Sequence, residues 1–481
     1  MSFVLYDLIF LAVFIIFVTF FLYKNRANLK REMKIIFLYK AQWGVDLINY
    51  IGDRYRWILG KLRYVIIGLG YILMAGILYL IGRTVYLYVT QPVLVTKLVK
   101  APPIAPLIPY FPQLFGMDDF FPPFYFAYFI IALAIVAIVH EFSHGIYMRY
   151  SKVGIKSTGI VFLGPFLGAF VEQKESDMVK ASKINQLSIL GAGVFANTIT
   201  AILFLFIWMG VFYMAFTPAG VFFNAYSSEL VNIDSITSIN EIELQNPDKS
   251  VLMNLLEQGR INDEIVLGSN GYSINVSEIM INGKKYYSNQ RILDAPLAFN
   301  GDKLLLYEDS PALNNRMVGV IKSVNDEEVK NYAELGNVLG KYSAGEEIKI
   351  ITDYNGEMLE YNLVLDENGL IGVGYSPAQK NMAEGIATMI FKEPGTHYDV
   401  KNDFLLFIYY LMFWIFIINL LVALFNMLPV SILDGGRFFY LTIWGITRSE
   451  KAAKRVNAWI GRIILFGVLL MMISWMFGIS Q

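Results

Sequence analysis

The sequence has few of the residues on which most soluble enzymes depend. It contains no cysteine, only three histidines (His140, His144 and His397), and only 16% charged residues among 481. Without cysteine, disulfides, thiol nucleophiles, iron–sulfur clusters and cysteine-ligated zinc are all excluded. Soluble chains are nearer a quarter charged, so a simple cytosolic enzyme is excluded as well. The net charge of −1 provides no basic field that would recruit nucleic acid.

Hydrophobic residues make up 56% of the chain, and many of them lie in long runs. A helix needs about 20 mostly apolar residues to cross a bilayer. The first run lacks a basic n-region and a small-residue cleavage site, so we interpret it as a span rather than a signal peptide. Six stretches meet the criterion for a transmembrane helix: 3–23, 63–90, 124–148, 186–215, 404–430 and 457–478.

Lysine and arginine near the span ends predict the orientation of the chain. Segments 24–63, 149–183 and 437–455 are basic, with ten basic against three acidic residues in the first, and we expect them to face the cytoplasm. Segment 91–123 has only two lysines, and segment 216–402 has 27 acidic and 14 basic residues. We expect these two segments to lie on the outer side, together with both termini.

Segment 216–402 is the polar part of the chain, and its pattern predicts a mixture of strands and short helices. Asn-Gly pairs, such as Asn282-Gly283 and Asn355-Gly356, mark turns between alternating runs. We expect strands at Lys303–Tyr307, Val318–Val324 and Ile348–Thr352, and helices at Lys249–Glu257 and Val329–Leu339.

The third span carries the sequence His140-Glu141-Phe142-Ser143-His144. Residues four apart share one face of a helix, so both imidazoles can reach one metal ion. Glu141 is then close enough to act on a water molecule at the metal, as in the HExxH pattern of metallopeptidases. The alternative is a purely structural polar cluster between helices. Ionisable groups inside a span are costly and usually mark function, which favours the metal site.

Two histidines leave zinc short of a protein ligand. His397 lies in the outer polar segment, so we interpret it as a surface or linker residue. Asp434 is the better candidate, because the third and fifth spans run in the same direction and place His140 and Asp434 at similar depth. Pro429 distorts the helix before Asp434, and the following Gly-Gly pair permits a close turn. The alternative is that Asp434 only caps a cytoplasmic helix.

These two motifs together resemble those of the site-2 protease family of intramembrane zinc metalloproteases. That family pairs HExxH with an N-P-x-P-x-x-x-L-D-G-like motif, here Asn426 to Gly435 with Met427 in place of the first proline. Its G-P-x-x-N motif corresponds to Gly193–Asn197, with Val194 in place of proline. The resemblance implies Asn197 or Asn426 near the oxyanion, and interhelical hydrogen bonding is the alternative for both.

The residues predict one Zn²⁺ held by His140, His144 and Asp434, with Glu141 as the catalytic proton acceptor. The 13-residue apolar stretch Gly159–Val171 is too short to span. We interpret it as a membrane-dipping hairpin that offers a strand edge to the substrate, with packing against the catalytic helix as the alternative.

The resemblance also implies a PDZ domain in the outer segment. The expected elements of residues 300–375 have the order typical of a PDZ domain in such proteases, and the role of residues 225–299 is open. The predicted fold is a membrane α-helical bundle of about six transmembrane helices with an inserted extracytoplasmic α+β PDZ-like domain. Its predicted parts are N-terminal spans (1–123), the first half of the catalytic core (124–215), the outer segment (216–402) and the second half of the core with the last helix (403–481).

Two functions compete on these observations. The first is an intramembrane zinc metalloprotease that cleaves transmembrane protein substrates in the lipid bilayer, with its site toward the cytoplasmic leaflet and a possible peptide ligand of the PDZ-like domain. The second is a membrane-anchored PDZ adaptor without catalysis. A metal-ion transporter is disfavoured, because no chain of ionisable residues crosses the predicted spans.

Overall fold

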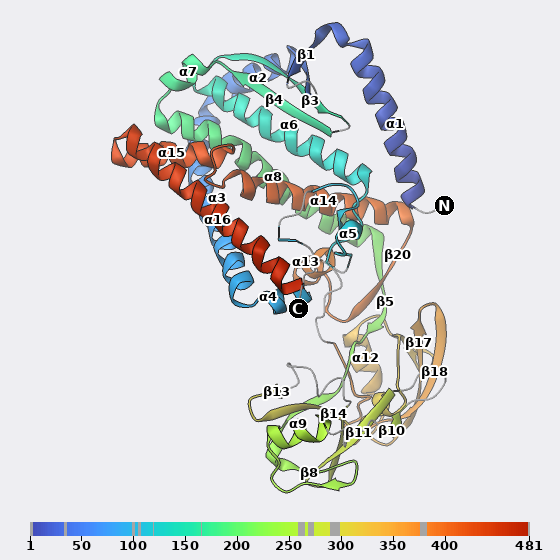
Figure 1. Cartoon of the computed structure of the whole chain (residues 1–481). Coiled ribbons are helices and arrows are strands. Elements are labelled where there is room, and N and C mark those ends of the chain that lie inside the picture. Colours follow the sequence, from blue (N-terminus) through green and yellow to red (C-terminus); the bar gives the residue numbers. More distant parts are fainter. Residues whose placement is uncertain are drawn as a thin grey trace. The chain divides into compact units, whose positions relative to one another are not determined.

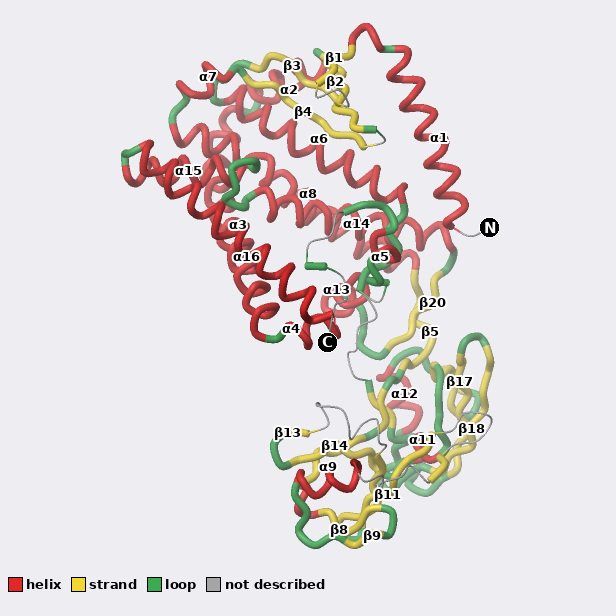
Figure 2. Tube along the Cα trace, in the orientation of Figure 1, coloured by secondary structure: helices red, strands yellow, loops and turns green. Residues whose placement is uncertain are grey.

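The computed structural model describes residues 3–32, 36–98, 102–103, 107–118, 120–164, 166–257, 265–267, 274–288, 299–375 and 382–479. The chain divides into two compact units. Unit 1 comprises Met1–Ala215, Lys380–Gly385 and Asn402–Gln481, and unit 2 comprises Phe216–Gln379 and Ile386–Lys401. The elements of both units are labelled in Figure 1. Unit 1 is mostly helical, whereas strands dominate unit 2 (Figure 2).

The described residues of unit 1 contain six helices that are long and apolar enough to cross a membrane. They confirm the six predicted spans, and the chain is a multi-pass membrane protein. The predicted fifth span was too long, because its helix ends at Asn426 rather than at 430; Pro429 cannot donate a helical hydrogen bond. The six helices are α1 (Phe3–Lys24), α3 (Arg56–Thr90), α6 (Phe126–Tyr150), α8 (Lys183–Ala215), α14 (Asp403–Asn426) and α16 (Glu450–Ile479).

Three of these helices, α6, α8 and α14, pack against one another and form the centre of unit 1. Large aromatic side chains fill the space between α8 and α14, where Trp208 lies against Tyr409 and Phe413. By contrast, only 11% of the most apolar window of α1 and of α16 is buried. The apolar surfaces of these two helices are therefore available to lipid.

Shorter elements of unit 1 surround this centre. Helix α2 packs against α6, where the absence of a side chain at Gly145 makes room for Ile48. Helix α15 occupies most of the predicted loop 437–455. These elements are η1 (Arg26–Asn28), α2 (Trp43–Arg54), α4 (Pro92–Leu98), α5 (Phe111–Leu114), α7 (Glu175–Lys180) and α15 (Asp434–Thr447).

A four-stranded antiparallel sheet lies along α6, in the order β1-β2-β3-β4 (Figure 1). Strands β3 (Ile155–Leu163) and β4 (Phe166–Gln173) confirm the hairpin predicted at Gly159–Val171; Pro165 lies outside the described residues. Strands β1 (Leu29–Glu32) and β2 (Ile36–Ala41) extend it and were not anticipated. Strand β4 is an edge of the sheet and packs against α6.

A buried carboxylate joins α1 to α6. Asp7 is 5% exposed, although it belongs to an otherwise lipid-accessible helix. Its two carboxylate oxygens accept the backbone N–H groups of Phe126 and Ala127 at 2.8 and 2.9 Å, and Oδ2 also accepts the hydroxyl of Tyr110. The first N–H groups of a helix have no partner within the helix. Asp7 therefore caps α6 from another helix.

Unit 2 contains an eight-stranded antiparallel sheet whose core includes Ile279, Leu304 and Leu306. Helix α9 (Lys249–Glu257), which matches its predicted bounds, covers this core with Leu252 and Leu255. The strands are β7 (Ser228–Asn232), β8 (Ile236–Ile239), β9 (Ile242–Glu243), β10 (Ile265–Leu267), β11 (Ile274–Ile281), β12 (Lys284–Ser288), β13 (Phe299–Asn300) and β14 (Lys303–Glu308).

A second, six-stranded sheet of unit 2 has the order β18-β17-β15-β5-β20, with β16 paired to β15. The expected strands and the expected helix within 318–352 are all present. However, β14 of segment 300–375 pairs in the other sheet, and β5 and β20 join this one from outside 300–375, so the PDZ assignment stays a prediction. The elements are β5 (Phe216–Phe222), α11 (Pro311–Asn314), β15 (Val320–Val324), β16 (Glu327–Glu328), α12 (Tyr332–Leu339), β17 (Glu347–Tyr354), β18 (Glu357–Val364) and β20 (Thr396–Val400).

The remaining elements are short. Strands β6 (Ala225–Tyr226) and β19 (Val373–Gly374) pair with each other. The 3₁₀ turn η2 (Ile233–Ser235) precedes β8, and helix α13 (Met382–Ile390) precedes β20.

Candidate metal centre

The two histidines of the HExxH motif lie on one face of α6 and are both buried. Their spacing of four residues places the two rings one helical turn apart. The Nε2 atoms of His140 and His144 are 3.0 Å apart, and the ring planes are nearly perpendicular. Both imidazoles therefore present Nε2 to the same point inside unit 1.

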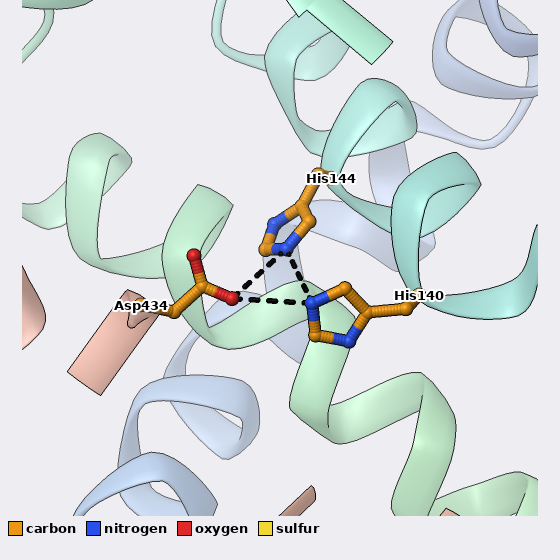
Figure 3. A group of neighbouring side chains, drawn as sticks. All are labelled: His140, His144 and Asp434. Carbon is orange, nitrogen blue, oxygen red and sulfur yellow. Dashed lines mark hydrogen bonds and ion pairs between the residues drawn. The ribbon is translucent and has the colours of Figure 1, made fainter. Parts of the chain in front are cut away.

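Asp434 joins this pair from a different part of the chain. Its Oδ2 lies 3.1 Å from His140 Nε2 and 3.2 Å from His144 Nε2 (Figure 3). Asp434 is the first residue of α15, where the positive end of the helix dipole favours a carboxylate. The structure thus brings together the three residues predicted as metal ligands, whose ligand atoms all lie within 4.8 Å of one another.

The turn before Asp434 depends on two glycines. A Cβ atom on Gly435 would lie 2.2 Å from the carbonyl carbon of Met427, and one on Gly436 would lie 2.2 Å from the carbonyl oxygen of Val430. No side chain fits at these distances. The end of α14 and the start of α15 can therefore approach closely enough to direct Asp434 at the imidazoles.

Backbone contacts determine which nitrogen of His144 carries its proton. His144 Nδ1 lies 2.7 Å from the carbonyl oxygen of Ile189, and a carbonyl can only accept, so Nδ1–H is the donor. In the neutral ring Nε2 then carries a lone pair. That lone pair faces Asp434 Oδ2, another acceptor, at 3.2 Å. Two acceptors at this distance repel each other unless a cation or a proton lies between them.

The three ligand atoms, two imidazole nitrogens and one carboxylate oxygen, fit a zinc ion. Two imidazole nitrogens and a carboxylate oxygen are common zinc ligands, and a water molecule completes the tetrahedron in catalytic sites. With ligand distances of 2.0–2.1 Å, neighbouring ligand atoms of a tetrahedral site are separated by about 3.3 Å. The three separations found here, between 3.0 and 3.2 Å, are close to that value.

Asn197 of α8 contacts Nδ1 of His140, the ring nitrogen that does not face Asp434. The residue is fully buried, and its Nδ2 lies 3.1 Å from His140 Nδ1, while its Oδ1 has no hydrogen-bond partner. A half-turn of the carboxamide brings Oδ1 to the same place, where it accepts a hydrogen bond from Nδ1–H. His140 Nε2 then has a free lone pair, which is the form that binds a metal.

Gly193 of α8 lies directly against the two rings. A Cβ atom at this position would be 2.6 Å from His140 Cε1 and 2.6 Å from His144 Nε2. The imidazoles therefore occupy the space that a side chain would take. Gly193 lets α8 pack closely against the HExxH face of α6.

His140, His144 and Asp434 line a cavity of about 600 Å³ together with Glu141. Glu141 Oε2 accepts the backbone N–H of Val171 in β4 at 3.1 Å, which orients the carboxylate. The wall contains ionisable, polar and apolar side chains. The lining residues are His140, Glu141, His144, Met148, Lys156, Val171, Glu172, Gln173, Glu175, Ile189, Leu190, Ser431, Ile432, Leu433, Asp434 and Arg437.

A charge network on the sheet borders this cavity. Glu172 of β4 accepts hydrogen bonds from Lys40 of β2 at 2.7 Å, Ser157 of β3 at 2.9 Å and Lys156 of β3 at 3.4 Å. The bond from Lys40, followed by that from Ser157, lowers the pKa of Glu172 to about 2. The network therefore ties three strands together beside the metal ligands, and Lys156 shares the single negative charge of Glu172 with Lys40.

The structure places the other predicted residues elsewhere. Asn426 is the last residue of α14, and it is not among the described residues that line the cavity. His397 belongs to β20 in unit 2, where its Nε2 lies 3.1 Å from Asp399 Oδ1. Sequence reasoning did not anticipate the contacts of Ile189 with His144 and of Val171 with Glu141, because Ile189 and Val171 contribute only their backbone atoms to them. It also missed Arg437, although its position three residues after Asp434 on a helix was a usable signal.

The described part of the chain thus combines six helices that are long and apolar enough to cross a membrane with a His-His-Asp group that could hold a metal ion beside an HExxH motif. The model of peptidase family M50 matches residues 128–471, and the chain belongs to this family. It is also similar to the uncharacterized protein MJ0971 of Methanocaldococcus jannaschii, with 27% identity over 307 residues. The similarity covers 64% of this chain and 54% of that protein, so the chain spans about half the length of its relative.

Proposed function

We propose that this chain is an intramembrane zinc metalloprotease, which hydrolyses peptide bonds in or near the transmembrane helices of membrane-protein substrates. The observation that carries the proposal is the convergence of His140, His144 and Asp434 beside Glu141 in one cavity of unit 1. The histidines lie within a helix long enough to span a bilayer. Membership of family M50 supports the same reaction.

In this proposal His140, His144 and Asp434 hold the metal, and Glu141 moves the proton. Zn²⁺ bound there supplies Lewis acidity, which polarises the scissile carbonyl and lowers the pKa of a water molecule to about 7. The Glu141 carboxylate accepts the proton of that water as the C–O bond forms, and then gives it to the leaving nitrogen as the C–N bond breaks. The Val171 N–H holds one oxygen of Glu141, which leaves the other free for the water.

Strand β4 supports a route for the substrate. A peptide in a regular helix is protected by its own hydrogen bonds, so a substrate must be extended before it is cleaved. Strand β4 is an edge of its sheet, and its Val171–Gln173 end lines the cavity. We propose that an unwound substrate pairs with backbone groups of this edge other than the Val171 N–H, which Glu141 holds, because edge strands offer free backbone groups to an incoming chain.

The basic segments 24–63, 149–183 and 437–455 support a site toward the cytoplasmic leaflet and a unit 2 on the outer side. We further propose regulated intramembrane proteolysis, in which a PDZ-like part of unit 2 binds a peptide or excludes substrates with bulky outer domains.

The test is cleavage by the purified full-length chain in lipid bilayers. We expect the zinc-loaded protein to cleave a transmembrane test substrate, and Glu141→Gln to lower kcat roughly 10²- to 10⁴-fold with zinc content unchanged. The exposed acid Glu450, which pairs with Lys454 on α16, supplies the matched control Glu450→Gln. Undiminished cleavage by the Glu141→Gln protein would sink the proposal.

A further inference from the structure

The cavity wall contains a cation that the proposed chemistry does not use. Arg437 lines the same cavity as the metal ligands and is half-buried. The lining contains one other lysine or arginine, Lys156, which lies 3.4 Å from Glu172 and shares that carboxylate with Lys40. Arg437 forms no ion pair with any carboxylate in the described part of the chain. Its guanidinium charge is therefore available to a ligand that enters the cavity.

The position of Arg437 in its helix is electrostatically unfavourable. It is the fourth residue of α15, so it lies in the first turn, where the helix dipole favours anions and disfavours cations. Asp434 in the same turn obeys this rule, but its carboxylate faces the two imidazoles. A cation in an adverse dipole, without an ion-pair partner among the described residues, can gain stability by binding an external anion.

We infer that Arg437 is a specificity-determining residue, which binds an acidic side chain of the substrate close to the scissile bond. This inference rests on the proposed proteolytic function. Residues three apart on a helix have Cβ atoms about 5–6 Å apart, so Arg437 projects on the same side of α15 as Asp434. In an extended chain, side chains on one face repeat about every 6.8 Å. An Asp or Glu about two residues from the scissile bond therefore matches this spacing.

The guanidinium group suits a carboxylate because it offers two parallel N–H donors. The same chemistry recognises phosphate, and a lipid headgroup is the other anion that a membrane provides. We favour the peptide carboxylate because Arg437 shares its cavity with Glu141 and with the edge of β4, where the proposed substrate backbone must pass.

The test measures binding separately from cleavage. Full-length Glu141→Gln protein in neutral-lipid nanodiscs is titrated with fluorescent transmembrane peptides, each carrying Glu, Gln or Lys at one position within three residues of the central bond. We expect the Glu peptide to bind about tenfold more tightly than the Lys peptide at one position, as for a charge-assisted hydrogen bond. Adding Arg437→Glu should reverse this preference, and Arg437→Lys should retain part of it. Arg448, exposed at the other end of α15, supplies the control Arg448→Glu, which should preserve it.

Three results would overturn the inference. One is an unchanged peptide preference in the Arg437→Glu protein with normal zinc content. The second is an equal loss in the Arg448→Glu protein, which would indicate a general field effect. The third is Arg437-dependent binding of anionic-lipid vesicles with no dependence on peptide charge. Failure of the wild-type protein to cleave any peptide would contradict the proteolytic function alone, because the binding series tests Arg437 independently.

Discussion

Replacing Asn197 by leucine should weaken zinc binding by about 10- to 100-fold, the range typical of partners that orient metal-ligating histidines. Asn197 is fully buried and lies 3.1 Å from the Nδ1 atom of His140. Metal binding at Nε2 requires the proton of His140 to sit on Nδ1, from which it forms a hydrogen bond to Oδ1 of Asn197 once the carboxamide is turned over. Without an acceptor, a buried N–H group is left unpaired, which costs about 1–3 kcal/mol. This cost corresponds to a factor of roughly 5 to 150 in affinity, using 1.4 kcal/mol per tenfold.

Competition with a chromophoric chelator measures this affinity in the purified full-length protein. Asn197→Asp should keep or tighten zinc binding, because a carboxylate only accepts. Asn419 provides a matched control: it is also a fully buried asparagine in a spanning helix, but its Nδ2 donates to the carbonyl of Ile415. Asn419→Leu should therefore leave zinc affinity unchanged. If Asn197→Leu binds zinc as tightly as wild type while its kcat falls, the positioning argument fails and the oxyanion role predicted from the resemblance is favoured.

Three further results are expected from contacts in unit 1. Gly193→Ala should lower the zinc content, because its Cβ would lie 2.6 Å from both imidazoles. Gly210→Ala on the same helix, with open space around it, should leave the zinc content unchanged. Full zinc content in both proteins would contradict this packing argument. Asp7→Ala should destabilise unit 1 by about 1 kcal/mol, the usual value of a helix cap, in a denaturant-unfolding assay; no change would mean that the cap is dispensable. Because the pKa of Glu172 is lowered to about 2, its contribution to the sheet should be present above about pH 4.5 and lost as the pH falls toward 2. Hydrogen exchange of the sheet should show this loss, and Glu172→Gln should remove it.

The features that the sequence predicted well are local or strongly periodic. The six spans follow from hydropathy alone, because no other structure satisfies 20 backbone amides in hydrocarbon except a closed barrel. The shared face of His140 and His144 follows from helical spacing. The approach of Asp434 was predicted from a match of depth and from the close turn that Gly435 and Gly436 permit, and the structure adds the backbone of Met427 and Val430 that these glycines approach.

The features that the sequence did not predict depend on partners distant in the chain. Strand β2 pairs with β3, from which it is separated by five described helices and more than a hundred residues, so neither its partner nor its register can be read locally. The same holds for β5, which pairs with both β15 and β20 in unit 2. The cap formed by Asp7 was missed for this reason too. A single carboxylate in a span indicates a buried partner, but not which one.

The two departures from the motifs of the resemblance have one structural explanation. Val194 and Met427 occupy positions where those motifs have proline, and both are fully buried in a single hydrophobic cluster with Phe438. Neither is among the described residues that line the cavity. Helix α8 continues through Val194 without interruption, so proline is not needed there to bring Gly193 against the imidazoles. At the second motif, Pro429 alone follows the end of α14, and Gly435 and Gly436 complete the turn. Val194 and Met427 therefore belong to the packing behind His140, His144 and Asp434, which converge on one point without proline at either position.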